Sequence, residues 1–315
     1  QTKINLRDAL RGLKDCRRGQ GRMHSVDTVM MIVVMGTLSG CYGYQPLGDF
    51  VRREGAALRR YLSPKNNKLP SVPTIWRVMT HIKEDEFLAI FSDWISGFHG
   101  TLKEELVAID GKALHGTKTS DEDAKLAHLV TMFAIDSKES LGMAKTVAKS
   151  NEIPLVMQMI EQMGQTGVIY TMDAMHCQKL TLQKVIDNHC NYIVGVKKNQ
   201  RKLLEQIEFN TSVSDPIDTN TTLDIHGNRI EQRTVNVYDD LYEIKGWPGI
   251  KRIITVTREV NIKGADKTTF EKAYFIPSLD KSASYFQKAI RGHWAIENSL
   301  HYVKDVTFLE DASTI

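Results

Sequence analysis

The sequence has few cysteines and no long apolar run, which argues against a disulfide-rich protein and against a membrane-spanning protein. Its longest apolar run, residues 26–38, is interrupted by Asp27 and Thr28 and is too short to cross a bilayer, so we expect no membrane partner. Four cysteines are too few and too scattered for a disulfide framework, which favours a reducing cytosol. They are Cys16, Cys41, Cys177 and Cys190.

Other sequence signals are also missing. No basic segment followed by an apolar stretch and a cleavage site opens the chain, so we expect no secretory signal. The chain starts at Gln1 rather than Met, which leads us to expect a missing or processed N-terminus. No internal repeat and no low-complexity tract is found, which leaves an ordinary globular organisation.

The composition is that of a soluble globular protein, with 42% apolar and 25% charged residues. A length of 315 residues suffices for two domains, or for one large domain with an insertion. The net charge of +3 hides an asymmetry, because residues 1–100 hold 15 basic and 9 acidic residues while the rest holds 26 and 29. A basic N-terminal part indicates nucleic-acid binding, although a solvated basic surface explains it as well.

The first hundred residues are predicted to be helical. Helical spacing of apolar residues appears over 8–19, 47–62 and 71–82, and the run over 26–38 is typical of a buried helix. Ser71 and Pro73 are helix-start signals. The last two helices, joined by a short turn, fit a helix-turn-helix with Thr74 and Arg77 exposed, and they fit a generic helical hairpin equally well.

From about residue 104 the pattern changes to strands alternating with helices. Strands are expected over 105–110, 129–136 and 141–148, the last two forming a hairpin. A helix over 153–163, a strand over 167–174, a helix over 180–188 and a strand over 191–197 follow. This order predicts an α/β fold with a mixed sheet. Three antiparallel strands (229–239, 252–261 and 267–277) then precede a helix over 282–303.

Two of the expected apolar strands run into an aspartate. The first leads to Asp110 and the other to Asp173. A carboxylate at such a place is costly to bury unless it is paired or bound to a cation, and ligand sites of open α/β sheets gather at strand ends. If the strands are neighbours, a third acid from a helix completes an oxygen-rich site for two Mg²⁺ or Mn²⁺ ions. Asp before Gly also simply favours turns, which is the alternative.

Six segments stand out along most of residues 20–313. They are AIDGKALHGTK, KSNEIPL, TMDAMHCQK, YIVGVKKNQ, WPGIKRI and HWAIENSLHYVKDVTFLEDAS. Through these landmarks, which occur in family order, the sequence resembles the H-repeat-associated DDE transposases of bacterial insertion sequences.

The resemblance implies an RNase H-like core with Asp110, Asp173 and Glu297 as the acidic triad, which selects Glu297 over the nearby Asp305, Glu310 and Asp311. The expected domains are a helical, basic DNA-binding region over 1–100, the first part of the catalytic domain over 101–204, a β-rich insertion over 205–278, and the last catalytic helix with the C-terminal segment over 279–315. The expected partners are transposon-end and target DNA, with a homodimer forming on the DNA in the bacterial cytoplasm, at the nucleoid.

The segment around Glu297 departs from the wider group. Many related transposases place Tyr and Arg before the glutamate and Lys seven positions after it. Here Lys304 keeps its position, so we count it as a catalytic candidate, whereas Ile290 and His293 occupy the Tyr and Arg positions. Arg291 is close but out of register. The residues expected to contact DNA are Arg17, Arg18, Arg22, Thr74, Arg77, Lys112, Lys197, Lys198, Arg201, Arg291 and His293.

Three alternatives stay open. A domesticated or truncated relative would act as a metal-dependent nuclease, and a non-enzymatic regulator would use only the basic N-terminal half. The third is a zinc site built from the His-Cys pairs at 176–177 and 189–190, but adjacent ligands on a helix point apart.

Overall fold

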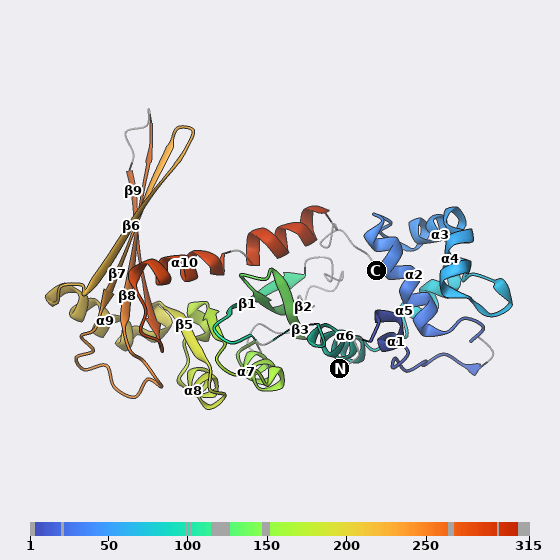
Figure 1. Ribbon diagram of the computed structural model, residues 1–315, viewed down its shortest axis with the longest axis horizontal. Coiled ribbons are helices and arrows are strands. Elements are labelled where there is room, and N and C mark those ends of the chain that lie inside the picture. The colour runs from blue at the N-terminus through green and yellow to red at the C-terminus, as the bar shows by residue number, and fades with distance from the viewer. Residues whose placement is uncertain are drawn as a thin grey trace, which may run out of the picture.

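The computed structural model describes residues 4–19, 22–98, 100, 102–114, 127–146, 152–263, 268–294 and 296–307. The elongated molecule has a helical part at one end, a mixed sheet flanked by helices in the middle, and a projecting strand ribbon at the other end (Figure 1). No helix within those residues is long and apolar enough to cross a membrane.

The helical part has its own hydrophobic core. Its helices are α1 (Leu6–Leu10), α2 (Val26–Leu38), α3 (Tyr44–Arg53), α4 (Gly55–Leu62), α5 (Val72–Met79) and α6 (Glu84–Ser96). Helix α2 has the bounds that the apolar run predicted, and most of it is buried among α1, α3 and α5. Helices α3 and α5 approach so closely that a Cβ on Gly48 would overlap the side chain of Val72.

Two helix predictions in this part are wrong in length. The helix expected over 8–19 ends at Leu10, and the chain beyond it forms a loop that Arg17 and Arg22 hold through side-chain bonds to Asp15 and to backbone carbonyls. The helix expected over 47–62 is two helices, because the backbone at Glu54 leaves helical geometry (φ −93°, ψ 13°).

A sheet of nine described strands organises the rest of the molecule, in the order β3-β2-β1-β4-β5-β9-β8-β7-β6. The parallel pairs are β1–β4 and β4–β5, and the other pairs are antiparallel. The strands are β1 (Leu106–Leu114), β2 (Ala127–Ala134), β3 (Glu139–Thr146), β4 (Ile169–Met172), β5 (Asn191–Val196), β6 (Asp218–His226), β7 (Arg229–Tyr238), β8 (Ile253–Ile262) and β9 (Thr268–Pro277).

Helices cover both faces of this sheet. One face packs on α7 (Glu152–Met163), α8 (Lys179–Asp187) and α9 (Arg201–Val213) through a large apolar cluster. The opposite face packs on α10 (Ala283–His293), whose Phe286 is fully buried against Leu106 and Ile169. The expected α/β class with a mixed sheet is therefore confirmed, and so is the hairpin between β2 and β3.

The strand and last-helix predictions need three corrections. Strand β1 continues four residues beyond Asp110, because its pairing with β2 runs on to Leu114 after its pairing with β4 has stopped. Strand β6 was not predicted, since its sequence is polar and mostly exposed. The helix expected over 282–303 is interrupted after His293, and π-helical turns follow over Ile296–His301 and Val303–Thr307. Parts of the predictions at 147, 148 and 267, and the acids at 310 and 311, lie outside the described residues.

Phe286 is the largest fully buried side chain of α10, so we expect it to contribute most to the packing of this helix on the sheet. Phe286→Ala removes a fully buried ring, so we expect the free energy of unfolding to fall by about 3–5 kcal/mol in urea denaturation. Leu180→Ala serves as the control, because Leu180 is 75% exposed and its loss is expected to change stability by roughly 0.5 kcal/mol or less. Equal effects of the two substitutions would contradict this packing.

Candidate active site

Asp110 and Asp173 lie side by side where strands β1 and β4 separate. The last paired residues of these parallel strands are Ile109 and Met172, so each aspartate is the next residue after the end of the ladder. Because side chains alternate along a strand, both carboxylates point to the face covered by α10. The sequence placed both aspartates at strand ends. The structure places Asp110 within β1, at the end of the β1–β4 pairing.

Glu297 approaches the same face from the π-helical turn that follows α10. The neighbouring Ile296 is 1% exposed and packs on Ala108 and Phe133 of the sheet, which anchors this turn beside β1. Glu297 itself is exposed. π-helical turns are rare and often occur at functional sites, because the extra residue redirects the side chains that follow.

The three acids interact electrostatically. Burial, the charge of Asp173 and, to a smaller extent, those of Glu297 and Glu152 raise the pKa of Asp110 to about 6, although the backbone N–H of Gly111, which donates to its Oδ1 at 2.9 Å, acts to lower it. Two histidines face the aspartates: His301 Nδ1 lies 3.6 Å from Asp110 Oδ2, and His293 Nε2 lies 3.8 Å from Asp173 Oδ1. Burial and the neighbouring carboxylates thus disfavour the charged form of Asp110.

His293 is held in this region rather than turned to solvent. Its Nδ1 is 3.0 Å from the hydroxyl of Thr171, and burial lowers the pKa of His293 while Asp173 opposes the shift. A histidine with a lowered pKa is neutral at pH 7, so it lacks the permanent charge of the arginine that stands there in related sequences.

The rival acid Asp305 has a partner. Its carboxylate pairs with the ammonium group of Lys112, which joins the second π-helical turn to β1. The Nζ of Lys304 lies 3.7 Å from the sulfur of Met143 on β3, so Lys304 is near the same sheet face. The structure therefore pairs Asp305 with Lys112.

The lysines of the KKNQ segment border a cleft beside Asp173. This cleft of about 590 Å³ is lined by Asp173, Lys197 and Lys198, together with His293 and Trp294. The amides of this segment hold the turn after Asp173: Asn199 donates to the carbonyl of Ala174, and Gln200 donates to that of Cys177. Further along, Arg201 is exposed and pairs with Glu205, and Arg291 pairs with Asp224 on β6.

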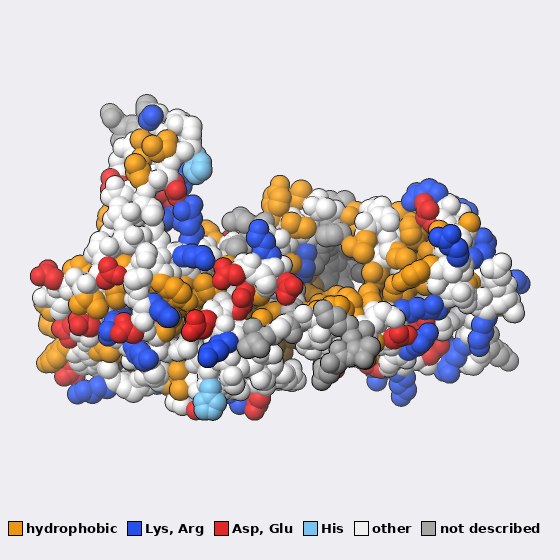
Figure 2. Space-filling model, in the orientation of Figure 1, with side chains coloured by type: hydrophobic (Ala, Val, Ile, Leu, Met, Phe, Trp, Pro, Cys, Tyr) orange, Lys and Arg blue, Asp and Glu red, His pale blue; other side chains and the backbone are white. Residues whose placement is uncertain are grey.

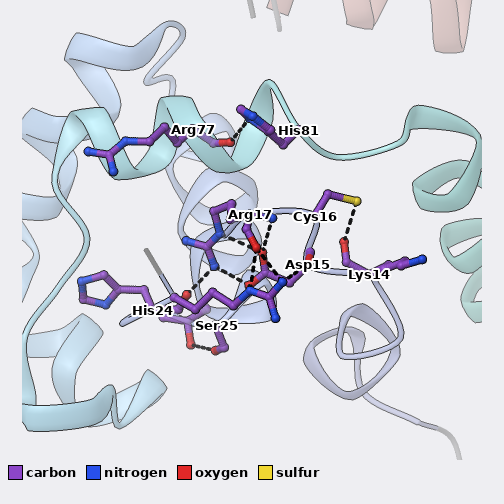
Figure 3. Close-up of polar contacts among 10 residues, drawn as sticks. Lys14, Asp15, Cys16, Arg17, His24, Ser25, Arg77 and His81 are labelled. Atoms are coloured by element: carbon purple, nitrogen blue, oxygen red, sulfur yellow. Dashed lines mark hydrogen bonds and ion pairs between the residues drawn. The ribbon is translucent and has the colours of Figure 1, made fainter. Parts of the chain in front are cut away.

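The basic residues of the helical part have different surroundings. Arg17 is only 8% exposed, pairs with Asp15 and donates to the carbonyl of His24, which gives it a structural role in its loop (Figure 3). Arg22 also donates to carbonyls of this loop. Arg18 and Arg77 are exposed, and Thr74 shares a 3.1 Å contact with Ser71 at the start of α5. All lie far along the chain from the acids.

The sequence did not indicate two residues that lie near the aspartates, and it suggested a third only as a zinc ligand. Glu152 and His301 were not predicted as site residues, although each lies in a segment that carried the resemblance. His176 was considered only for zinc, yet its ring lies 3.4 Å from Glu152. Both Cys177 and Cys190 are buried in the core beneath the sheet, and burial raises the pKa of Cys177 to about 12.

Comparison with known proteins identifies the family of this chain. Residues 101–315 match the family model described as transposase DDE domain, and residues 7–95 match the model described as DDE_Tnp_1-associated. The chain belongs to the transposase DDE domain family and, within it, to the H-repeat-associated transposases.

Its relatives include bacterial proteins named as putative transposases. The chain is 31% identical to the putative transposase YncI of Escherichia coli O157:H7, over 99% of this chain and 82% of that protein. It is 27% identical to the H repeat-associated putative transposase YhhI of Escherichia coli strain K12, over 91% and 79%. A solved structure that resembles this chain is the cryo-EM structure of a piggyBac transposase synaptic complex with hairpin DNA. The superposition has a TM-score of 0.45 at 11% sequence identity and covers 91% of this chain and 62% of that chain.

The raised pKa of Asp110 predicts a pH-dependent stability in metal-free buffer. Its folded pKa of about 6 exceeds its ordinary value of 3.8, so the folded protein holds this proton more tightly. Stability should therefore fall as pH rises from about 4 to about 6. Asp110→Asn removes the charge, and at pH 7 we expect it to raise the free energy of unfolding by about 1–3 kcal/mol.

The control for that measurement is Asp239→Asn, at an exposed position. It should leave the stability difference between pH 4 and pH 7 as in the wild type. An Asp110→Asn protein that is no more stable than the wild type at pH 7 would show that Asp110 is not in a charge-crowded place.

Proposed function

We propose that this protein is a metal-dependent DDE transposase, which cleaves transposon-end DNA and joins it to target DNA. The observation that carries the proposal is the placement of Asp110 and Asp173 at the end of the β1–β4 ladder, where burial and neighbouring acids raise the pKa of Asp110 to about 6. Such crowding is costly unless cations neutralise it, and it is typical of sites built to bind them.

The residues fit divalent cations by the chemistry of their donors. Carboxylate oxygens suit Mg²⁺ and Mn²⁺, and the acids come from two strands and a helical turn of one sheet face. As they stand, no three His, Cys, Asp or Glu side chains within the described residues are close enough to hold an ion. Asp110 and Asp173 would hold two ions together, and the exposed side chain of Glu297 would complete the site.

The five strands β3-β2-β1-β4-β5 are the part that we assign to the RNase H-like core. Three antiparallel strands are followed by two parallel strands, each preceded by a helix, α7 or α8. The strands β6–β9 that extend the sheet would form the insertion, and helices α1–α6 the DNA-binding region. Basic side chains are spread over the helical part, which suits a polyanionic partner (Figure 2).

The reaction is an in-line phosphoryl transfer carried out twice. In the first, water attacks the phosphorus at the transposon end and the bond to the 3′ oxygen breaks, which leaves a 3′-hydroxyl. In the second, that hydroxyl attacks a phosphorus of the target DNA and displaces another 3′ oxygen. When bound, the two ions would activate the attacking oxygen and stabilise the leaving one.

The chain's own residues position the DNA for both transfers. Lys197 and Lys198 border the cleft beside Asp173 and would hold phosphates that flank the scissile bond. Lys304, which lies by β3, would do so from the other side. Neutral His293 is held against Thr171 and Asp173 and would orient Asp173 rather than bind phosphate as a cation. We propose that two copies of the chain act together on the DNA, one at each end.

Cleavage of the inverted-repeat DNA of the parent element tests the proposed activity. With Mg²⁺ the wild type should nick the end, whereas Asp173→Ala and Glu297→Gln should lose about 1,000-fold or more of the rate, because each removes a carboxylate of the site. Asp239→Ala, at an exposed position, is the control and should keep the wild-type rate. Unchanged cleavage by Glu297→Gln would remove the third acid from the assignment.

A strand-transfer assay with the same DNA separates the rival functions. Joining to a target plasmid is expected of the transposase, cutting without joining is expected of a nuclease derived from it, and binding without cutting is expected of a regulator. Either of the last two results with wild-type protein would contradict the proposal.

The lysines of the cleft predict a salt effect. Lys198→Ala removes one proposed phosphate contact, so the affinity for end DNA should fall and the slope of log K against log salt should become shallower by about 1. Lys245→Ala, an exposed lysine on the loop between β7 and β8, should leave the slope unchanged. Equal slopes for wild type and Lys198→Ala, measured by fluorescence anisotropy, would exclude Lys198 from the DNA surface.

A further inference from the structure

A buried acid–base pair lies beneath the two aspartates, on the opposite face of the sheet. Glu152, the first residue of α7, is 2% exposed, and His176, in the short turn after β4, is 1% exposed. His176 Nε2 lies 3.4 Å from Glu152 Oε1. Burying a carboxylate and an imidazole together is costly, and such pairs persist where their geometry serves a purpose.

The pair connects the two segments that carry the aspartates. Glu152 packs directly against Gly111, the neighbour of Asp110, so closely that a methyl group on Gly111 would lie 2.6 Å from its Cδ. His176 belongs to the turn that begins at Asp173, and its backbone N–H donates to the carbonyl of Asp173 at 3.0 Å. Glu152 therefore touches β1 at Gly111 and, through His176, the turn after β4.

The β1–β4 pairing brings the aspartates to adjacent positions but does not include them. Backbone pairing between β1 and β4 stops at Ile109 and Met172, one residue before each aspartate. Beyond that point Glu152, packed on Gly111, and His176, in the turn after β4, connect the two segments through their contact. Asn199 and Gln200 hold the turn after Asp173 by donating to its carbonyls, and His176 connects this turn to β1 through Glu152.

The surroundings of His176 indicate which nitrogen carries the proton. In the described part of the chain, its Nδ1 is buried without a hydrogen-bond partner. A buried N–H without an acceptor is costly, so the proton belongs on Nε2, where it is directed at Glu152. The protonated Nε2 then faces the Glu152 carboxylate at 3.4 Å.

We propose that Glu152 and His176 are positioning residues that hold Asp110 and Asp173 at the spacing that divalent cations require. This inference rests on the proposed function, because it assumes that the aspartates bind the ions. Groups that orient metal ligands in this way typically change metal affinity by about 10-fold to 100-fold when they are replaced.

Mn²⁺ binding to the full chain, measured from the electron paramagnetic resonance signal of free Mn²⁺, tests the pair without an activity assay. Glu152→Gln and His176→Gln should each weaken binding by about 10-fold to 100-fold. The double variant should be no weaker than the weaker single variant, because both substitutions break the same contact. Wild-type affinity in either single variant, or effects that multiply in the double variant, would overturn the proposal.

Glu231→Gln is the matched control for lost stability. Glu231 is a buried carboxylate (6% exposed) on β7 that pairs with Arg229, Arg233 and Arg258, away from the aspartates. Its replacement should lower the free energy of unfolding and leave Mn²⁺ affinity unchanged. If Glu231→Gln weakens Mn²⁺ binding as much as Glu152→Gln does, the pair has only a structural role and the inference fails.

The same titration separates this inference from the proposed function. A wild type that binds no Mn²⁺, or that binds it equally well as Asp110→Asn, would contradict the metal site itself. Wild-type binding that depends on Asp110 and not on Glu152 or His176 would contradict only the positioning pair.

Discussion

The parallel pairing of β1 with β4 is the constraint on which the site depends. It ends at Ile109 and Met172 and thereby brings two carboxylates, distant in sequence, to adjacent positions on one sheet face. Their mutual repulsion, with burial, raises the pKa of Asp110 and works against the fold in the absence of cations. The apolar clusters on both faces supply the stability that keeps the aspartates together.

The other parts of the molecule are arranged around that edge of the sheet. Helix α10 crosses the face that carries the aspartates and delivers the π-helical turn with Glu297, while α7 delivers Glu152 to the opposite face. The helical part contacts the sheet and the C-terminal π-helical turn. Lys145 of β3 pairs with Glu84 of α6, and the Tyr42 hydroxyl donates to the carbonyl of Thr307 at 2.6 Å. The helical part therefore touches the π-helical turn that follows the one with Glu297.

The sequence predicted what depends on local periodicity and failed where tertiary contacts decide. The apolar run of α2 and the alternation in β7 and β8 gave nearly the observed bounds. The loop after α1 could not be predicted, because the side-chain bonds of Arg17 and Arg22 shape it. The break after His293 was also missed, because nothing in the helical pattern signals a π-helical turn. Glu152 has no local signal either: its role is visible only once α7 lies against Gly111.

Anomalous scattering from a crystal soaked in Mn²⁺ is the most direct test of the claim that the acids form a two-ion site. The account predicts two peaks bordered by Asp110 and Asp173, with the Glu297 carboxylate drawn toward one of them, and no peaks at that place in Asp110→Asn crystals. A map without density between the two aspartates, at a concentration of Mn²⁺ that supports DNA cleavage, would contradict it.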